Sequence, residues 1–369
     1  MKENFLSKFR LLLAAQIWAL AITSPPALAV DGQPLKVGFV YVSSVSDLGW
    51  TMAHDQGRQY LEKTLGGRVQ TTVAENIPET AQVERVVEKM IAQGNKLIFS
   101  TSYGYLEPVL RVAARHPDVI FMQCQRYSRA KNVGTYFASQ QDPMYIAGFV
   151  AGKVTKKNKL GYLAGHPVPP VLACINAFAL GAQKANAKAR VQVVWNNSWS
   201  DPANEAEATK GLIETGADVI ASQLNTSSTV VQTAEKEHVY SIGMETDLSK
   251  MAPRGWLLAQ LWHWGPLYVK IAKSVIDHQW QAGNTIYSMK DGYVGISPFG
   301  QAVPAAVQKE AKALAQNIVS AKVAVLQGPV KDQTGSVRIE AGRHAGEKDL
   351  ENMNWLVEGV DGAVPAQEK

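Results

Sequence analysis

The sequence predicts an α/β protein with two doubly wound parallel-sheet lobes, and three observations carry that prediction. From Leu35 onwards, short apolar runs typical of strands buried on both faces alternate with amphipathic segments. This alternation occurs twice, and the second series begins near residue 142. The length of 369 residues also exceeds the usual range of one domain. Strands that alternate with helices favour parallel sheets covered by helices on both faces.

The first series begins with the apolar run 36–42, which we expect to form a buried strand. Apolar residues recur at helical spacing over 83–91, and Gly94 follows where a helix commonly ends. The other elements expected in this series are a helix at 54–61, a strand at 69–73, a strand at 96–100, a helix at 109–114 and a strand at 119–122.

The second series contains two helix-start signals, Asp142-Pro143 and Asp201-Pro202, in each of which an N-cap residue precedes a proline. The expected elements are helices at 144–154, 178–187, 202–215 and 229–236, with strands at 160–164, 191–195, 219–222 and 239–244. Beyond them we expect a strand at 256–262, a helix at 263–278, a strand at 293–296 and a helix at 304–323.

The C-terminal part of the chain leaves two alternatives open. After about residue 327 the sequence is rich in Gly, Lys and Asp, and residues 353–360 form its last apolar patch. Either this part is a partly ordered extension, or Trp355 docks on one of the lobes.

The N-terminus has the three features of a secretory signal peptide. Lys2, Lys8 and Arg10 form a basic region, an apolar stretch covers 11–22, and Ala27-Leu28-Ala29 is typical of a cleavage site. We therefore expect residues 1–29 to be removed and the protein to be periplasmic. A membrane anchor is the alternative, but the apolar stretch is short for one. There is no cysteine near the cleavage site, so we expect no lipid anchor.

Composition excludes several classes of protein. Hydrophobic residues make up 46% of the chain and charged residues 19%, which is typical of a folded globular protein. Removing the signal peptide lowers the formal net charge from +5 to +3, too little to indicate nucleic-acid binding. Two cysteines exclude a disulfide scaffold. We expect Cys124 and Cys174 in different lobes and therefore as free thiols.

Motifs for catalysis are absent from the sequence. It contains no dinucleotide-binding glycine fingerprint, no phosphate-binding P-loop, no nucleophile elbow and no zinc-protease motif. The seven histidines are scattered, without a second histidine or cysteine at metal-ligand spacing. The sequence therefore predicts no catalytic residue, no metal and no cofactor, and a protein that is not an enzyme.

The loops after the strands are rich in small polar residues and large aromatic residues. In doubly wound sheets the loops at the carboxyl ends of the strands line the ligand crevice. The loops in question are 43–50, 101–105, 123–127, 165–167, 196–201, 223–226 and 245–247. Aromatic rings beside amides and carboxylates suit a planar, polar small molecule. The ligand-binding residues predicted on this basis are Asp47, Trp50, Ser102, Tyr103, Trp199, Asn225, Glu245 and Asp247.

Most of these residues have a structural alternative. Trp50 and Trp199 can serve as packing residues at helix starts. Asp47 and Asp247 can cap short helices, and Asn225 and Glu245 can belong to turns. Two further tryptophans, Trp262 and Trp264, are candidates for either the site or the core.

Six segments together resemble the basic membrane protein family of ABC-transporter substrate-binding proteins. They are 36–41 (KVGFVY), 45–50 (VSDLGW), 54–57 (HDQG), 101–105 (TSYGY), 132–136 (NVGTY) and 289–292 (MKDG). The resemblance implies the type I periplasmic-binding-protein fold, with two lobes joined by three crossovers. Lobe one is expected at 35–138 plus 263–288, lobe two at 141–261 plus 291–325, and a C-terminal extension at 326–369. The crossovers are expected near 137–141, Trp262 and Met289.

The same resemblance implies a function. We expect a monomer that binds a small molecule, a purine base or nucleoside, between the lobes and delivers it to an inner-membrane ABC permease. The Asp-Leu-Gly-Trp form of the first loop resembles the members that bind bases such as adenine. A Lys-Ser-Phe-Asn loop, more usual in nucleoside binders, is absent. The alternative is a periplasmic sensor subunit that presents a small molecule to a receptor.

Overall fold

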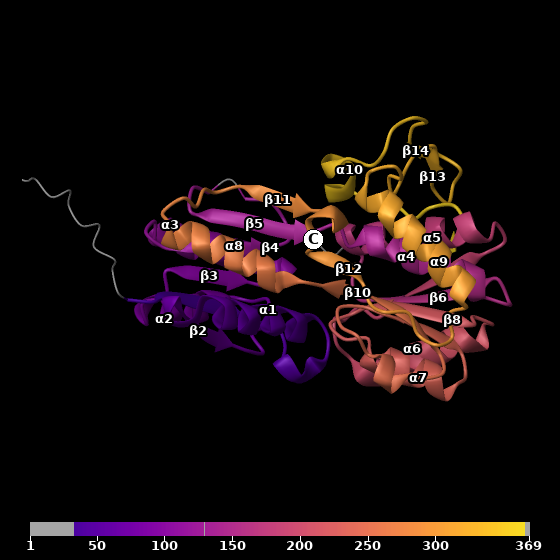
Figure 1. The fold of residues 1–369 in the computed structure, drawn as a ribbon, viewed down its shortest axis with the longest axis horizontal. Helices are drawn as coiled ribbons and strands as arrows, with labels where there is room; N and C mark the ends of the chain where they lie inside the picture. The colour runs from indigo at the N-terminus through magenta and orange to yellow at the C-terminus, as the bar shows by residue number, and fades with distance from the viewer. Residues whose placement is uncertain (1–32, 129, 366–369) are drawn as a thin grey trace, which may run out of the picture. The chain divides into compact units, whose positions relative to one another are not determined.

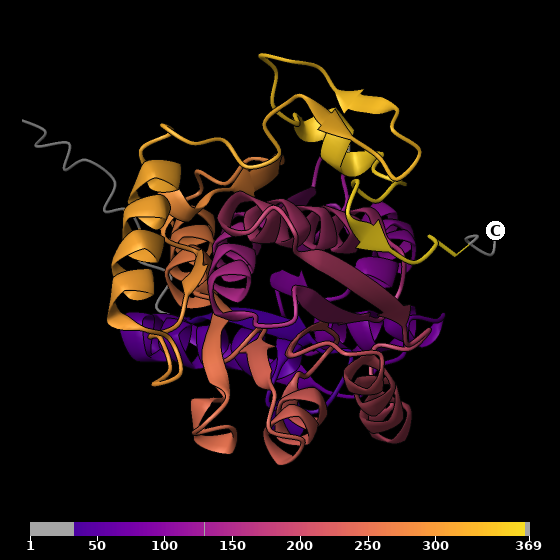
Figure 2. The same cartoon turned by 90° about the vertical axis from the view of Figure 1, so that its right-hand side faces the viewer.

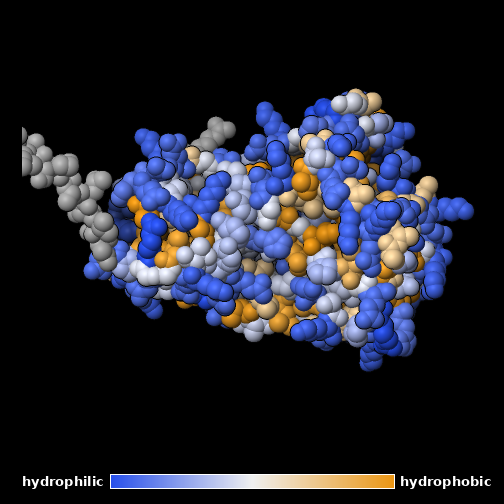
Figure 3. All heavy atoms as spheres, in the orientation of Figure 1, coloured by the Kyte–Doolittle hydropathy of each residue, from blue (hydrophilic) through white to orange (hydrophobic). Residues whose placement is uncertain are grey.

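The computed structural model describes residues 33–128 and 130–365, which form two open sheets with helices on both faces (Figure 1). The predicted signal peptide, residues 1–29, lies outside the described residues. Within the described part of the chain, no helix is both long and apolar enough to cross a membrane. Figure 3 shows that hydrophilic residues predominate on the face it draws, with hydrophobic residues in separate patches among them.

The first sheet has six strands in the order β11-β5-β4-β3-β1-β2, and all neighbouring strands are parallel. The strands are β1 (Leu35–Val40), β2 (Val69–Ala74), β3 (Leu97–Ser100), β4 (Ile120–Cys124), β5 (Val133–Ala138) and β11 (Asn284–Tyr287). The helices of this sheet are α1 (Trp50–Leu65), α2 (Gln82–Ala92), α3 (Leu106–Arg115) and α8 (Trp264–Ile276). Successive β1 residues serve opposite faces: Phe39 packs with α1 and α8, and Val40 packs with α2 and α3. We call this sheet with its helices lobe one.

The second sheet has seven strands in the order β12-β10-β9-β8-β6-β7-β15, parallel except for the antiparallel pair β12 and β10. The strands are β6 (Lys159–Ala164), β7 (Arg190–Trp195), β8 (Val219–Gln223), β9 (Tyr240–Gly243), β10 (Trp256–Trp262), β12 (Val294–Ile296) and β15 (Val360–Asp361). The helices are α4 (Gln141–Val154), α5 (Pro169–Ala185), α6 (Pro202–Glu214), α7 (Ser228–Lys236) and α9 (Ala305–Val319). Figure 2 shows α4, α5 and α9 on one face and α6 and α7 on the other. We call this sheet with its helices lobe two.

The chain passes between the two sheets three times. It leaves lobe one between β5 and α4, returns between β10 and α8, and leaves again between β11 and β12. The predicted α/β fold class with three crossovers is therefore confirmed. The residue bounds assigned to the lobes from the sequence stay predictions.

Several local predictions were wrong, and tertiary contacts explain them. The helix expected at 178–187 begins at Pro169, because the apolar first turns of α5 are buried against α4. The expected cap at Asp142 lies inside α4, which begins at Gln141. Strand β11 was missed because it lies at a sheet edge and carries exposed, polar residues. The cap at Asp201 is confirmed, since its side chain accepts a hydrogen bond from the Asn204 amide at 3.1 Å.

The C-terminal segment beyond α9 is built onto lobe two. It contains β13 (Val330–Lys331), β14 (Val337–Ile339), α10 (Glu347–Glu351) and β15, which pairs with β7. Met353, Leu356 and Val357 are buried in the lobe-two core, and Trp355 packs against it. Of the two alternatives left open by the sequence, docking of Trp355 on a lobe is the one observed.

Five short 3-10 helices complete the described chain. They are η1 (Val45–Asp47), η2 (Gly66–Arg68), η3 (Tyr103–Tyr105), η4 (Ser249–Met251) and η5 (Met289–Asp291). Both cysteines are free, as predicted: Cys124 ends β4 in lobe one, and Cys174 lies in α5 of lobe two.

Candidate functional site

A cavity lies where the carboxyl ends of the two sheets meet. In lobe one the strand order reverses at β1, whose neighbours are β2 and β3, and in lobe two it reverses at β6, whose neighbours are β7 and β8. Ligands of doubly wound sheets bind at such switch points. The cavity encloses about 490 Å³ of empty space, including the part open to solvent, and both lobes line it.

The structure brings six of the eight predicted residues together at this cavity. They are Trp50, Ser102, Tyr103, Trp199, Asn225 and Glu245. Asp47 and Asp247 are not among the residues that line it. Asp47 accepts hydrogen bonds from the amides of Gly49 at 2.9 Å and Met52 at 3.3 Å, so it stabilises the start of α1. Asp247 accepts a hydrogen bond from the Ser249 amide at 2.9 Å, beside η4.

Trp50 is both a wall of the cavity and a part of the lobe-one core. It is the first residue of α1 and only 8% exposed. Its indole Nε1 donates a hydrogen bond to the Thr101 carbonyl at 2.7 Å. The ring lies edge-on to His54, with 4.4 Å between ring centroids. These contacts fix the ring in one orientation beside the cavity.

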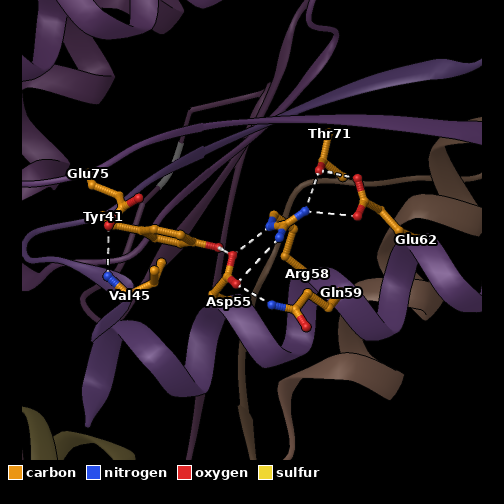
Figure 4. A network of polar contacts seen from close by, with 8 residues as sticks. All are labelled: Tyr41, Val45, Asp55, Arg58, Gln59, Glu62, Thr71 and Glu75. Carbon is orange, nitrogen blue, oxygen red and sulfur yellow. Dashed lines mark hydrogen bonds and ion pairs between the residues drawn. The ribbon is translucent and has the colours of Figure 1, made fainter. Parts of the chain in front are cut away.

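A polar network holds α1 and its preceding loop against the sheet (Figure 4). Arg58 donates a hydrogen bond to Asp55 at 2.6 Å and another to Thr71 of β2 at 2.9 Å. Glu75, just after β2, accepts a hydrogen bond from the Val45 amide at 2.8 Å. The network therefore positions the loop and the helix start that carry Trp50.

Glu245 is a buried acid at the lobe-two side of the cavity. Its exposed fraction is 5%, and its backbone adopts a φ of 75°, a conformation uncommon for this residue type. Burial raises the pKa of its carboxyl group to about 8, despite a hydrogen bond from the Trp262 indole, and the negative charge of Asp47 also raises it. At neutral pH the group is therefore mainly a protonated acid, which both donates and accepts hydrogen bonds.

The loop before α1 also contacts lobe two directly. The Trp50 amide donates a hydrogen bond to the Asn225 carbonyl at 2.6 Å, and the Thr246 hydroxyl donates one to the Leu48 carbonyl. A Cβ atom at Gly49 would lie 1.8 Å from the Asn225 carbonyl oxygen. Glycine is therefore required for the lobes to approach this closely at the cavity mouth.

Other lining residues are held by neighbouring loops. Trp199 accepts a hydrogen bond at its carbonyl from the Asn225 amide at 2.8 Å, and its ring lies edge-on to His166, with 4.9 Å between centroids. The Ser102 hydroxyl donates a hydrogen bond to Glu79 at 2.6 Å. The cavity thus combines two indole rings with amide, hydroxyl and acid groups.

Seven lining residues were not predicted from the sequence. They are Gln125, Gln140, Val168, Pro170, Val171, Gln223 and Leu224. Three of them lie in loops that the sequence had indicated, at 123–127 and 223–226. Val168, Pro170 and Val171 lie at the start of α5, and the proline pair 169–170 was an available signal for that helix start. Gln140 had no comparable signal.

Among residues 33–128 and 130–365, no group of three or more His, Cys, Asp or Glu side chains is arranged to hold a metal ion.

Comparisons with known proteins agree with this geometry. Residues 35–333 match the family described as "ABC transporter substrate-binding protein PnrA-like". A purine-binding protein of Brucella abortus is 41% identical over 333 residues, which cover 90% of this chain and 95% of that protein. A Haloferax volcanii protein named as an ABC-transporter glucose-binding protein is 32% identical, over 91% of this chain and 83% of that protein.

Solved structures support the fold. An ABC-transporter solute-binding protein of Aeropyrum pernix superposes with a TM-score of 0.70 at 17% sequence identity, over 81% of this chain and 93% of that chain.

Proposed function

This chain belongs to the PnrA-like family of ABC-transporter substrate-binding proteins, and from that premise we propose that it binds a purine base or purine nucleoside in the cavity between its lobes. In this proposal it acts in the periplasm as a free monomer, delivers the ligand unchanged to an inner-membrane permease, and is not an enzyme. The 41% identity to a purine-binding protein supports the ligand class.

The observation that carries the proposal is the chemistry of the cavity wall. Two indoles, Trp50 and Trp199, line the cavity, and an indole ring has apolar faces on which a flat ring can stack. Asn225 and the buried acid Glu245 offer both donors and acceptors. A purine has two apolar faces and an edge that carries donors and acceptors, so it suits a wall of this kind.

The test begins with the protein's own ligand. Protein purified without denaturation is examined by mass spectrometry for a co-purified small molecule. Ligand-stripped protein is then titrated calorimetrically with adenine, adenosine and glucose. We expect saturable binding of at least one purine and no turnover of it. Binding of glucose in place of both purines, as the name of the Haloferax volcanii relative suggests for that protein, would contradict the proposed ligand class.

Gly49 gives a prediction specific to closure of the lobes. We expect Gly49→Ala to weaken adenine binding about tenfold or more. The added methyl group overpacks the closed form and destabilises it by about 1–3 kcal/mol relative to a form in which the lobes are apart. The added Cβ meets Asn225 across the cleft, so the unfolding transition of the ligand-free protein should change little. The measurement is calorimetric titration beside a thermal melt.

The matched control is Gly67→Ala in the same lobe, where a Cβ has no heavy atom within 4 Å. It should leave adenine affinity unchanged. Equal affinities in the two variants would show that contact between Gly49 and Asn225 is not part of ligand binding.

A further inference from the structure

Trp262 belongs to lobe two by its backbone and to lobe one by its side chain. It is the last residue of β10, a strand of the lobe-two sheet, and the chain then passes to α8 of lobe one. Its ring is 5% exposed and packs in the lobe-one core with Trp50, Trp264 and Phe137. The rings of Trp262 and Trp264 are stacked, with 4.6 Å between centroids. The indole is therefore held where the chain crosses between the lobes.

The same indole contacts two residues that line the ligand cavity, one from each lobe. Its ring meets the Trp50 ring edge-on, with 5.8 Å between centroids, and its Nε1 donates a hydrogen bond to Oε2 of Glu245. Trp50 and Glu245 line the cavity, whereas Trp262 lies behind them and does not. Trp262 therefore supports one side chain that can stack on a flat ring and one that can bond to its edge.

The two carboxyl oxygens of Glu245 have different surroundings. Oε2 accepts the hydrogen bond from Trp262. Within residues 33–128 and 130–365, Oε1 has no hydrogen-bond partner, and it keeps some exposed surface although the residue as a whole is buried. Because Glu245 lines the cavity, Oε1 is the oxygen that is open to it.

The indole also determines which oxygen carries the proton of the neutral acid. An indole N–H can only donate, so Oε2 must present a lone pair to it. The proton is then favoured on Oε1, which is open to the cavity. A buried donor of this kind requires an acceptor, because an unpaired one is costly. The ring nitrogens of a purine that carry no hydrogen are such acceptors, and they lie on the edge of the flat ring.

We propose that Trp262 is a positioning residue for ligand recognition: by holding Oε2 of Glu245, it directs the proton on Oε1 to a ring nitrogen of the purine. The inference rests on the proposed function, since it assigns how the edge of a purine is recognised. It extends that function to specificity, because a ring with C–H in place of this nitrogen offers no acceptor. The lobe-one core thus sets the direction of a donor that belongs to lobe two.

The test compares two neighbouring tryptophans of the same stack. Trp262→Phe keeps an aromatic ring in the core but removes the N–H that binds Glu245. Trp264→Phe is the matched control, because its indole is 1% exposed and its Nε1 has no hydrogen-bond partner in the described part of the chain. Both changes replace a buried indole by a smaller ring, so a difference between the variants reports the bond to Glu245.

The first measurement is calorimetric titration at neutral pH with adenine and its ring-deaza analogues, each of which has C–H in place of one ring nitrogen. We expect one analogue to bind about tenfold or more weakly than adenine, and this preference should disappear in Glu245→Ala. The preference should shrink about threefold or more in Trp262→Phe and stay unchanged in Trp264→Phe. Glu245→Gln should keep it, since its oxygen can accept from Trp262 while its NH2 group donates to the ligand.

The second measurement needs no ligand and gives the pKa of Glu245 in the folded protein. It uses the pH-dependent difference in unfolding free energy between each tryptophan variant and the same variant with Glu245→Gln. The bond from Trp262 stabilises the ionised carboxylate, so its loss should raise the pKa further, and the loss of stability should continue to a higher pH. Trp264→Phe should leave the pKa unchanged. Four other titratable groups interact with this carboxyl group and are present in both members of each pair: Asp47, Cys124, Cys174 and Tyr162.

An unchanged preference in Trp262→Phe, or an equal change in both tryptophan variants, would overturn the positioning role, because the N–H would then have no specific effect. Loss of the preference in Glu245→Gln would overturn it independently, since that variant leaves the tryptophan stack intact. Equal binding of adenine and all its analogues by the unaltered protein would overturn it as well.

If the unaltered protein binds no adenine, the proposed ligand fails separately. The pKa of Glu245 then decides the role of Trp262 without a ligand. A rise confined to Trp262→Phe supports the positioning of this carboxyl group by the indole, and the absence of a rise overturns it.

Discussion

Trp50→Ala is expected to weaken adenine binding by about 30-fold or more and to lower the free energy of unfolding by about 3–5 kcal/mol. The first effect follows because the indole forms a wall of the ligand cavity, where loss of an aromatic anchor costs about 2 kcal/mol or more. The second follows because the same ring is 8% exposed and packs against His54 and Trp262. The structure thus combines two roles that the sequence analysis treated as alternatives.

Trp50→Phe separates the two roles. It keeps an aromatic face toward the cavity but loses the hydrogen bond to the Thr101 carbonyl, which lies 2.7 Å from Nε1. We expect a loss of about 1–3 kcal/mol in unfolding free energy, with adenine affinity closer to that of the unaltered protein than in Trp50→Ala. Calorimetric titration and denaturant unfolding measure the two quantities.

Trp195→Phe is the matched control for Trp50→Phe. Its indole Nε1 also donates to a backbone carbonyl, that of Ala363 at 2.8 Å, but Trp195 does not line the ligand cavity. Its replacement should leave adenine affinity unchanged. If Trp50→Ala binds adenine as tightly as the unaltered protein, Trp50 is a core residue only and the site must be placed elsewhere.

The sequence was sufficient to predict which loops line the cavity, because their position follows from chain order. Alternating strands and helices define parallel sheets, and parallel sheets place all loops after strands at one edge. Six of the eight residues chosen from those loops line one cavity. No bound ligand tests their role in recognition, so that role stays a prediction.

Local pattern could not separate neighbours within one loop. Asp47 and Trp50 are three residues apart in the same polar and aromatic stretch. The chain turns at Leu48, which has a φ of 62°, so the Asp47 carboxylate points back to the amides of α1 while Trp50 faces the cavity. A left-handed leucine has no sequence signal, since this conformation is uncommon for large side chains.

Long-range contacts set the other limit on what the sequence predicts. Helix α10 and Tyr127 line the same cavity, beside the ligand cavity, although about 220 residues separate them, and short polar helices of this kind carry no apolar periodicity. The start of α5 had a local signal in the proline pair 169–170, but the burial of its first turns comes from contact with α4. Each of these features depends on tertiary packing, which overrides local preference.

Glu245→Gln is expected to bind adenine with nearly unchanged affinity at pH 6–7, while Glu245→Ala should lose about tenfold or more. The carboxyl group, with a pKa of about 8, is mainly protonated at these pH values. Glutamine is a close neutral substitute for a protonated glutamic acid, because it can accept the hydrogen bond from Trp262 and still donate one to a ring nitrogen of the ligand. A site that required an ionised carboxylate would instead lose affinity in Glu245→Gln as in Glu245→Ala.

The same acid should make stability and binding depend on pH. Its pKa is raised from 4.5 to about 8 in the folded protein, so folding favours the protonated form. The resulting contribution to the unfolding free energy is fully present below about pH 4.5 and is lost as the pH rises through about 8, by at most about 5 kcal/mol. Burial also raises the pKa of Asp47, and it raises that of Asp142 to about 7, so these acids add their own pH dependence. The contribution of the Glu245 carboxyl group is therefore the difference in unfolding free energy between the unaltered protein and Glu245→Gln.

We therefore expect the unaltered protein to lose unfolding free energy relative to Glu245→Gln as the pH rises from 5 to 9. Adenine affinity of the unaltered protein should fall by up to tenfold per pH unit above about 8, since an ionised carboxylate cannot donate a hydrogen bond. In Glu245→Gln the affinity should stay level over pH 6–9. Urea unfolding and calorimetric titration at matched ionic strength provide the two curves. Parallel pH profiles in the two proteins would mean that Glu245 does not titrate between pH 6 and pH 9. If Glu245→Gln also lost affinity, the group would be ionised throughout, and the ligand would have to present a donor to this side of the cavity.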